Sequence, residues 1–214
     1  MATHEPSAAH SAAIEDYAKA IYALESRGGE AVSTNALAER LGVTAASASG
    51  MVKRLDELGL VEHRPYRGVS LTAGGRRVAL EVMRHHRLLE LYLFESLGVP
   101  WDRVHDEAEV LEHVLSDELE ALIAAKLGNP THDPHGDPIP TIELEIEESA
   151  TVPLQSLEAG AAGMFTRISD SDPDMLRFLA DRGISPGDLL EVIDKQPFGG
   201  PLFVRFGERV QVRR

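Results

Sequence analysis

The chain of 214 residues contains no cysteine. Disulfides, thiolate metal ligands, iron–sulfur clusters and cysteine nucleophiles are therefore excluded, and any metal ion would be held by His, Asp, Glu, Met or backbone oxygen. Long apolar runs are missing as well, and the first thirty residues lack a basic flank followed by an apolar core. We therefore expect a soluble, intracellular protein that has no membrane partner.

Basic residues are outnumbered, because 21 Lys and Arg stand against 35 Asp and Glu, giving a formal net charge of −14. Such a chain is not an overall polycation that coats nucleic acid. The charge is segregated, however: residues 33–77 contain seven Lys or Arg and four Asp or Glu, whereas residues 102–120 contain eight acidic residues and one Arg. Since DNA responds to the charge of the docking face, a DNA-binding module on an acidic body is compatible with this composition.

Three helices are predicted after residues 1–10, an aperiodic stretch that we expect to be a mobile tail. A tight turn at Gly42-Val43 separates the second and third helices, and Thr44 caps the third. Two short β-type runs, residues 60–61 and 69–71, then flank a basic loop and favour a hairpin. Together these elements predict a winged helix-turn-helix domain over residues 11–75.

The third helix and the hairpin have the composition of a DNA-binding surface. In a helix-turn-helix the second helix enters the major groove, where small and hydroxyl residues permit close approach and cations bind phosphates. The candidate DNA-binding residues are Thr44, Ser47, Ser49, Lys53, Arg54, Arg64 and Arg67. The alternative is a winged helix used for protein contacts, in which the two wing arginines are simply solvated charges.

Helical patterns continue over residues 76–128, with helices predicted at about 73–97, from Pro100 onward, and at about 116–127. Residues 129–149, which begin with a stretch dense in Pro, Gly and Asp, are predicted to be a linker. Residues 150–214 are predicted to form a small β-barrel domain, with one short helix near 173–182. The β-type runs beyond the helices are residues 141–146, 162–168, 188–193, 202–206 and 208–212. The predicted fold is thus mainly α, with a winged helix-turn-helix domain, a helical domain and a small C-terminal β-barrel.

Four potential metal ligands share one face of a single predicted helix: His105, Glu109, Glu112 and His113. His86 and Glu90 form a further pair four residues apart, and Asp16 lies on the polar side of the first helix. Neighbouring carboxylates repel unless something positive neutralises them, which a divalent cation does. Such groupings also occur on solvated helices without metal. A metalloenzyme would need an open coordination position, but no catalytic motif accompanies the cluster, so we expect no enzyme and no small-molecule substrate.

Six segments resemble, in the same order, the diphtheria toxin repressor family of metal-dependent regulators. They are IEDYAKAIYAL, LGVTAASASGMVKRLDELGLV, YRGVSLTAGGR, VMRHHRLLE, VHDEAEVLEHVLSDELE and DPHGDPIP. The resemblance extends from about residue 12 to the end and is weakest in the terminal domain. It implies a cytoplasmic homodimer whose metal-loaded form binds double-stranded operator DNA and represses metal uptake genes. It also implies that residues 76–128 form the metal-binding and dimerisation domain.

The same resemblance implies two metal sites per subunit. The primary site would consist of Asp16, Glu109, Glu112 and His113. The ancillary site would consist of His86, Glu90 and His105, joined by His135 and Asp170.

The choice of metal follows from two of these positions. Iron-sensing relatives carry Met and Cys where this chain has Asp16 and Glu109, whereas manganese-sensing relatives have the acidic pair seen here. Because hard oxygen donors suit Mn(II), we expect Mn(II), with Fe(II) as the alternative. Lys19 stands where one binuclear manganese-sensing branch has Glu, which argues against that arrangement. A metal-independent winged-helix regulator, which would need neither acidic residue, remains the other alternative.

Overall fold

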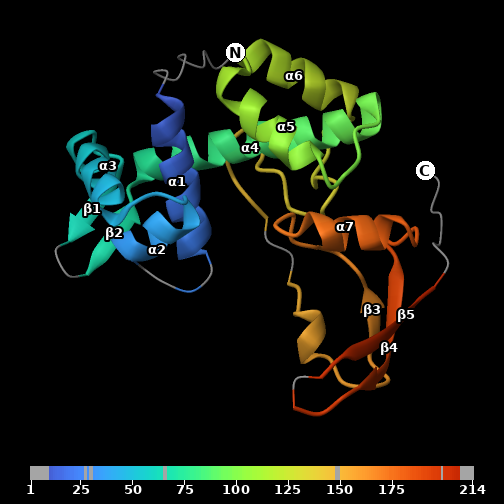
Figure 1. The fold of residues 1–214 in the computed structure, drawn as a ribbon. Coiled ribbons are helices and arrows are strands. Elements are labelled where there is room, and N and C mark those ends of the chain that lie inside the picture. The colour runs from blue at the N-terminus through green and yellow to red at the C-terminus, as the bar shows by residue number, and fades with distance from the viewer. Residues whose placement is uncertain are drawn as a thin grey trace. The chain divides into compact units, whose positions relative to one another are not determined.

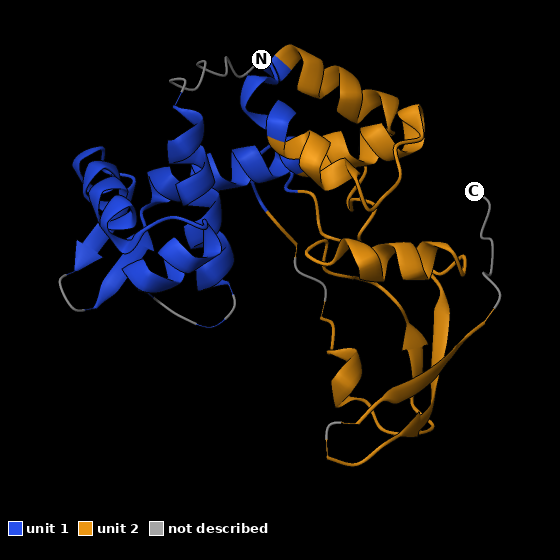
Figure 2. Cartoon of the chain, in the orientation of Figure 1, with its two compact units in different colours: residues 1–86, 110–117, 140–145 blue, residues 87–109, 118–139, 146–214 orange. Residues whose placement is uncertain are grey.

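The computed structural model describes residues 10–26, 28, 31–64, 67–147, 150–198 and 200–207. These residues divide into two compact units (Figure 2). Unit 1 comprises residues 1–86, 110–117 and 140–145, and unit 2 comprises residues 87–109, 118–139 and 146–214. Apart from His10, the predicted N-terminal tail lies outside the described residues. No helix in the described part of the chain is long and apolar enough to cross a membrane.

Unit 1 begins with the three predicted helices, α1 (Ala12–Glu25), α2 (Thr34–Arg40) and α3 (Ala45–Glu57) (Figure 1). The Oγ of Ser33 accepts the backbone N–H of Ala36 at 3.1 Å, and Thr44 Oγ1 accepts that of Ser47 at 3.1 Å. Both contacts satisfy N–H groups that a helix leaves unpaired at its start. The predicted cap of the third helix, Thr44, is therefore confirmed, and Ser33 is the cap of the second helix.

A two-stranded antiparallel sheet follows, formed by β1 (Val61–Arg64) and β2 (Gly68–Leu71). Its first strand extends further than predicted, because Arg64 pairs with Gly68 at the end of the ladder. Val32, which precedes α2, exchanges two backbone hydrogen bonds with Val69 of β2 at 2.8 and 2.9 Å. This bridge ties the hairpin to the helix-turn-helix.

The long predicted helix is confirmed as α4 (Ala73–Leu97), and the boundary between the units falls inside it, after His86. Thr72 Oγ1 accepts the N–H of Gly75 at 3.1 Å and so begins the helix. The first turn of α4 lies directly on the chain that enters the hairpin, since a Cβ on Gly75 would lie 1.9 Å from the backbone oxygen of Leu60. Glycine is therefore required for this close approach.

The predicted single helix bearing four ligands is wrong. Its α-helical part, α5 (Val104–Leu111), ends before Glu112 and continues as a 3₁₀ turn, η1 (Glu112–Val114). A 3₁₀ turn has three residues per turn, so it rotates Glu112 and His113 away from the positions they would take in a continued α-helix. The helix also begins later than predicted, at Val104, because the residues after Pro100 form a turn. The next helix is α6 (Asp117–Lys126).

The C-terminal part of unit 2 is a small domain with an open three-stranded sheet in the order β3-β4-β5. Its elements are η2 (Leu154–Ser156), β3 (Ala162–Met164), α7 (Pro173–Ala180), β4 (Leu189–Lys195) and β5 (Leu202–Phe206). No closed barrel is present among the described residues, and the predicted strand 208–212 lies outside them.

The strand predicted over residues 141–146 is wrong. The segment forms a turn, closed by a 2.7 Å hydrogen bond from the N–H of Thr141 to the oxygen of Glu145, with Leu144 at a φ of +62°. A residue in this left-handed conformation cannot continue a strand.

Replacing Gly75 by Ala tests the close approach at the start of α4. Gly75→Ala should destabilise the fold by roughly 1–3 kcal/mol, because the added Cβ overpacks against backbone that cannot rotate away. Gly74→Ala is the matched control, since its Cβ would meet its nearest neighbour at 3.6 Å. The control should be neutral or stabilising by up to about 1 kcal/mol, as alanine favours helices. Chemical denaturation measures both, and equal stabilities would contradict the packing argument.

Candidate metal centres

Unit 1 brings together three of the four residues predicted for the primary site. Asp16 comes from α1, whereas Glu112 and His113 come from η1, and one ligand atom of each lies within 4.8 Å of the others. His113 Nε2 lies 3.0 Å from Asp16 Oδ1 and 3.5 Å from Glu112 Oε1. The donors are carboxylate oxygens and imidazole nitrogen, which suit Mn(II) and other first-row divalent ions.

Glu112 is the best-buried member of this group, with 1% of its surface exposed. Its Oε1 accepts a hydrogen bond from Lys19 Nζ at 2.6 Å, and its Oε2 lies 2.5 Å from His86 Nδ1. Burial raises the pKa of Glu112, but the contacts with His86 and Lys19 outweigh it and hold the pKa below its usual value. The repulsion expected among these carboxylates is therefore already countered by cationic groups of the chain.

Lys19 was not predicted as a neighbour of Glu112. The available signal is its position three residues after Asp16, which places both side chains on one face of α1. Glu15 makes a further contact, since its Oε2 lies 2.5 Å from His113 Nδ1. The group in unit 1 is thus larger than the predicted ligand set.

Two predicted ligands do not lie in the same unit as the other members of the site to which they were assigned. Glu109, predicted for the primary site, belongs to unit 2, where its Oε1 lies 3.9 Å from His105 Nε2. His86, predicted for the ancillary site, belongs to unit 1, where it contacts Glu112.

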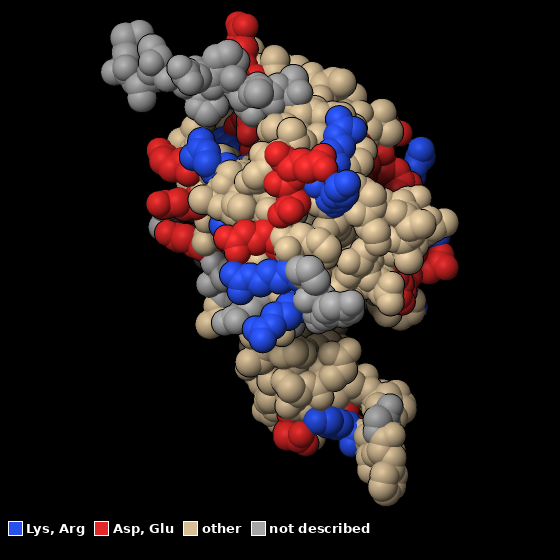
Figure 3. All heavy atoms as spheres, turned by 90° about the vertical axis from the view of Figure 1, so that its left-hand side faces the viewer, with Lys and Arg blue, Asp and Glu red and all other residues tan. Residues whose placement is uncertain are grey.

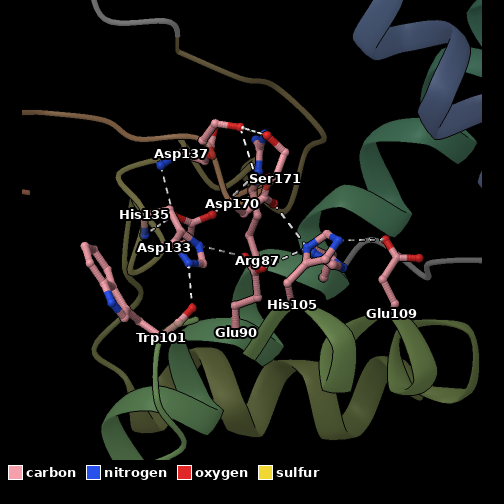
Figure 4. A network of polar contacts seen from close by, with 12 residues as sticks. Arg87, Glu90, Trp101, His105, Glu109, Asp133, His135, Asp137, Asp170 and Ser171 are labelled. Atoms are coloured by element: carbon pink, nitrogen blue, oxygen red, sulfur yellow. Dashed lines mark hydrogen bonds and ion pairs between the residues drawn. The ribbon is translucent and has the colours of Figure 1, made fainter. Parts of the chain in front are cut away.

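Unit 2 brings together Glu90 of α4, His105 of α5 and Asp170, which precedes α7 (Figure 4). His105 Nδ1 lies 3.1 Å from Asp170 Oδ2 and 3.4 Å from Glu90 Oε1. Hydrogen bonding to Asp170 and Glu90 raises the pKa of His105 to about 10. In turn, contact with His105 lowers the pKa of Asp170, although burial acts in the opposite direction. The three side chains form a cluster of oxygen and nitrogen donors.

His135 reaches the same cluster from the segment predicted to be a linker, and it is completely buried (Figure 4). Its ring stacks on Trp101 with centroids 5.9 Å apart, and its Nε2 lies 2.9 Å from the backbone oxygen of Trp101. Its Nδ1 lies 3.8 Å from Glu90 Oε2. Burial lowers the pKa of His135, but Glu90 and Asp133 outweigh it and raise the pKa to about 9.

Asp133 is a buried member of this cluster that sequence reasoning missed. Its Oδ1 accepts the backbone N–H groups of His135 at 2.8 Å and of Asp137 at 2.9 Å. Burial and the negative charges of Glu90 and Asp137 raise the pKa of Asp133 to about 8. The only signal in the sequence is the spacing Asp-x-His within DPHGDPIP, which says nothing about burial.

The loop that carries Asp133 and His135 packs closely against the backbone that leads to Asp170. Gly136 has a φ of +85°, and a Cβ there would lie 1.9 Å from the backbone oxygen of Thr166. The oxygen of His135 accepts the N–H of Ile168 at 2.9 Å. These contacts place the candidate ligands from the loop and from the C-terminal domain beside one another.

The predicted DNA-binding residues lie on α3 and on the hairpin, and all of them are exposed. The buried face of α3 is formed by Ala48, Val52 and Leu55, so its opposite face is free of the core. Thr44 caps the helix, and Ser49 Oγ donates to the oxygen of Ala45 at 2.8 Å. These hydroxyls therefore have local structural partners.

The cationic side chains of this surface lie among acidic ones (Figure 3). Lys53 Nζ lies 3.8 Å from Glu57 Oε1, and Arg64 donates to Glu62 at 3.0 Å. Exposed pairs of this kind are weak and leave the cation accessible to phosphate. The surface has the Lys and Arg side chains that phosphate contacts require. They lie on the second helix of the helix-turn-helix and on the hairpin that follows it.

Comparisons with known proteins agree with a DNA-binding surface and with metal-binding clusters. Residues 10–69 match the model "Iron dependent repressor, N-terminal DNA binding domain", and residues 72–141 match "Iron dependent repressor, metal binding and dimerisation domain". Residues 152–214 match the FeoA domain.

Relatives match over most of the chain. The iron-dependent repressor IdeR of Mycobacterium tuberculosis (strain ATCC 25618 / H37Rv) is 35% identical over 202 residues, covering 89% of this chain and 87% of the relative. The diphtheria toxin repressor of Corynebacterium diphtheriae is 34% identical over 191 residues, covering 85% and 84%. A solved structure of a manganese-dependent transcriptional repressor in complex with manganese is 46% identical, with a TM-score of 0.84, and covers 91% of this chain and 90% of that one.

Replacing Gly136 by Ala tests whether the loop depends on its contact with Thr166. Gly136→Ala and its control, Gly128→Ala, both place a side chain at positive φ, which costs roughly 1–2 kcal/mol. Only Gly136 would also drive a Cβ into backbone, since Gly128 has open space around it. Denaturant unfolding followed by the fluorescence of Trp101, the single tryptophan, should therefore show a larger loss of stability for Gly136→Ala. A loss no larger than that of the control would refute the contact.

Proposed function

Because the chain belongs to the diphtheria toxin repressor family of metal-dependent transcriptional repressors, we propose that it binds operator DNA as a homodimer when loaded with metal and represses metal uptake genes. The observation that carries this proposal is the cluster of Asp16, Glu112 and His113, which joins α1 to η1 in the unit that also contains the helix-turn-helix. The protein would act in the cytoplasm and would not be an enzyme.

The proposed primary site consists of Asp16, Glu109, Glu112 and His113. The first, third and fourth of these supply donors that lie within reach of one ion in unit 1. Carboxylates and imidazole favour Mn(II), which we propose as the physiological metal, with Fe(II) as the alternative because it accepts the same donors.

The proposed ancillary site consists of His86, Glu90, His105, His135 and Asp170. Glu90, His105 and Asp170 support it by their mutual distances in unit 2. The two metal sites of each subunit would then have different roles. The primary site would act on the DNA-binding domain, and the ancillary site would hold the C-terminal domain to the helical domain.

The domains are proposed to be residues 11–75 for DNA binding, 76–128 for metal binding and dimerisation, 129–149 as the linker and 150–214 as the C-terminal domain. The last of these is proposed to be a small β-barrel domain.

Metal would control DNA binding by fixing α1. Asp16 is on α1, whereas its partners Glu112 and His113 follow α5, so a shared cation would strengthen the attachment of α1 to η1. Fixing α1 in each subunit sets the spacing of the two recognition helices at the two half-sites. A coupling of about 1–3 kcal/mol changes operator affinity roughly 5–150-fold.

Operator binding measured with and without metal tests this function. Adding Mn(II) to the metal-free protein should raise operator affinity roughly 5–150-fold, and Fe(II) and Zn(II) titrated in parallel give the order of preference. Asp16→Ala should abolish the Mn(II) response, because it removes the ligand on α1, whereas Asp170→Ala should weaken it only partly.

The control for these variants is Asp106→Ala, which removes an exposed carboxylate of α5 and should leave the response intact. Equal operator affinity with and without Mn(II) in the unaltered protein would indicate a metal-independent regulator. The reverse ranking of Asp16 and Asp170 would mean that the primary and ancillary assignments are exchanged.

Salt dependence tests the DNA-binding surface. Arg67→Ala should weaken operator binding for all sequences and reduce the slope of log K against log salt by about 1, because one phosphate contact is lost. Lys126→Ala removes an exposed cation at the end of α6 and serves as the control. An unchanged slope for Arg67→Ala would remove the wing from the proposed DNA contacts.

A further inference from the structure

Glu25, the last residue of α1, holds the point at which the hairpin joins α4. Its Oε1 accepts the backbone N–H of Leu71, the last residue of β2, at 2.8 Å. Its Oε2 pairs with Arg76, near the start of α4, at 3.0 Å. The side chain of Glu25 is only 10% exposed. Because hydrogen bonds to an ionised acceptor are stronger than neutral ones, a single carboxylate ties three elements together.

The N–H of Leu71 lies on the outer edge of β2, away from β1. Successive N–H groups of an antiparallel strand point to opposite sides, and the N–H of the next residue, Thr72, donates to the oxygen of Leu60 at 3.0 Å. The N–H of Leu71 is therefore directed away from the ladder, toward Glu25. An N–H removed from water needs an acceptor. The end of β2 consequently depends on a side chain of α1.

Arg76 is held by a second side chain of α1. Its guanidinium carbon lies 5.3 Å from the centre of the Tyr22 ring, and a cation over an aromatic ring is attracted to it. Tyr22 is buried and precedes Glu25 by three residues, so both side chains lie on one face of α1. The end of α1 is thus attached to the start of α4 through the same arginine twice.

The other end of α1 carries Asp16, the candidate metal ligand that lies close to Glu112 and His113. The hairpin has two attachments along the outer edge of β2. The backbone of Val32 ties it to the segment before α2, whereas Glu25 ties it to the helix that bears Asp16. A restraint applied to α1 near its start therefore reaches the hairpin through Glu25.

We propose that Glu25 is a positioning residue that couples metal binding at the primary site to the placement of the hairpin on DNA. This inference rests on the function proposed above, and it assigns a role to a residue that is neither a proposed metal ligand nor a proposed DNA contact. Removing its carboxylate should leave metal binding and DNA binding each possible and weaken the connection between them.

The competing role for Glu25 is purely structural, in which it holds the hairpin in place whether or not metal is bound. The two roles differ in the metal gain, which is the ratio of operator affinity with Mn(II) to operator affinity without it. A structural residue lowers both affinities by the same factor and leaves the metal gain unchanged. A coupling residue lowers the metal gain itself.

The test measures the metal gain of the full-length chain on a duplex that the Mn(II)-loaded protein selects from a random DNA library. Glu25→Ala should reduce the metal gain roughly 2- to 30-fold, because the N–H of Leu71 and Arg76 both lose their contact with α1. Glu25→Gln should give an intermediate value, since its amide oxygen can still accept the N–H of Leu71 but no longer pairs with Arg76 as an ion. Mn(II) affinity without DNA should be unchanged in both variants, because every proposed ligand is kept.

Ser33→Ala is the matched control, since it removes the side-chain cap of α2 and so weakens the same unit without altering the contacts of α1 with the hairpin. It should keep the full metal gain. Amide hydrogen exchange followed by mass spectrometry gives a second readout without DNA. Mn(II) should slow exchange in the hairpin of the unaltered protein and of Ser33→Ala, and should not do so in Glu25→Ala. Circular dichroism verifies that each variant is folded, and if Glu25→Ala is not, Glu25→Gln alone decides.

Three results would overturn the proposal. An unchanged metal gain in the Glu25 variants would assign Glu25 the structural role and leave the proposed function intact. A loss of Mn(II) affinity in these variants would place the effect at the ligands rather than in the coupling. The absence of any metal gain in the unaltered protein would overturn the proposed function, and this inference with it.

Discussion

Two glutamates buried in the helical part of the chain constrain much of what surrounds them. Glu90 and Glu112 are each 1% exposed, so each charge must be compensated at close range. Glu112 finds Lys19 and His86, and Glu90 finds His105 and His135. In unit 1, the contacts of Glu112 join η1 to α1 and to α4. In unit 2, the contacts of Glu90 join α4 to α5 and to the loop at 133–137.

The compensation of Glu112 changes the physical picture of metal binding in unit 1. A cluster of bare carboxylates would gain its whole Coulomb energy from an incoming cation. Here Lys19 already occupies one carboxylate oxygen at 2.6 Å, so a metal ion competes with an ammonium group of the chain. The gain in energy is smaller, and α1 is attached to η1 before metal arrives. In the proposed function, metal would therefore tighten an existing contact rather than create one, which is consistent with a coupling of a few kcal/mol.

The features that could be predicted from the sequence depend on neighbours a few residues apart. Ser33, Thr44 and Thr72 begin helices through hydrogen bonds to residues three positions ahead, and those helices lie where the apolar spacing placed them. The end of α5 at Leu111 could not be found in this way, because the pattern of His105 to His113 fits an unbroken helix equally well. Lys19 and Glu112 are 93 residues apart, so their contact exists only once α1 and η1 meet. The burial of Asp133 was hidden for a similar reason, since its neighbour Arg87 lies on α4, far from it in the sequence.

The helix α1 connects the candidate metal ligands of unit 1 to the hairpin. Asp16 lies near its start, and nine residues later, about 13 Å along the axis, Glu25 lies at its end. Glu25 Oε1 accepts the N–H of Leu71 in β2 at 2.8 Å, and its Oε2 pairs with Arg76 of α4 at 3.0 Å. A helix of this length bends little, so a restraint on Asp16 is felt at the hairpin through these two contacts. The proposed coupling between metal and DNA would therefore need no rearrangement inside the helix-turn-helix. It would need only that α1 move as a rigid element held at both ends.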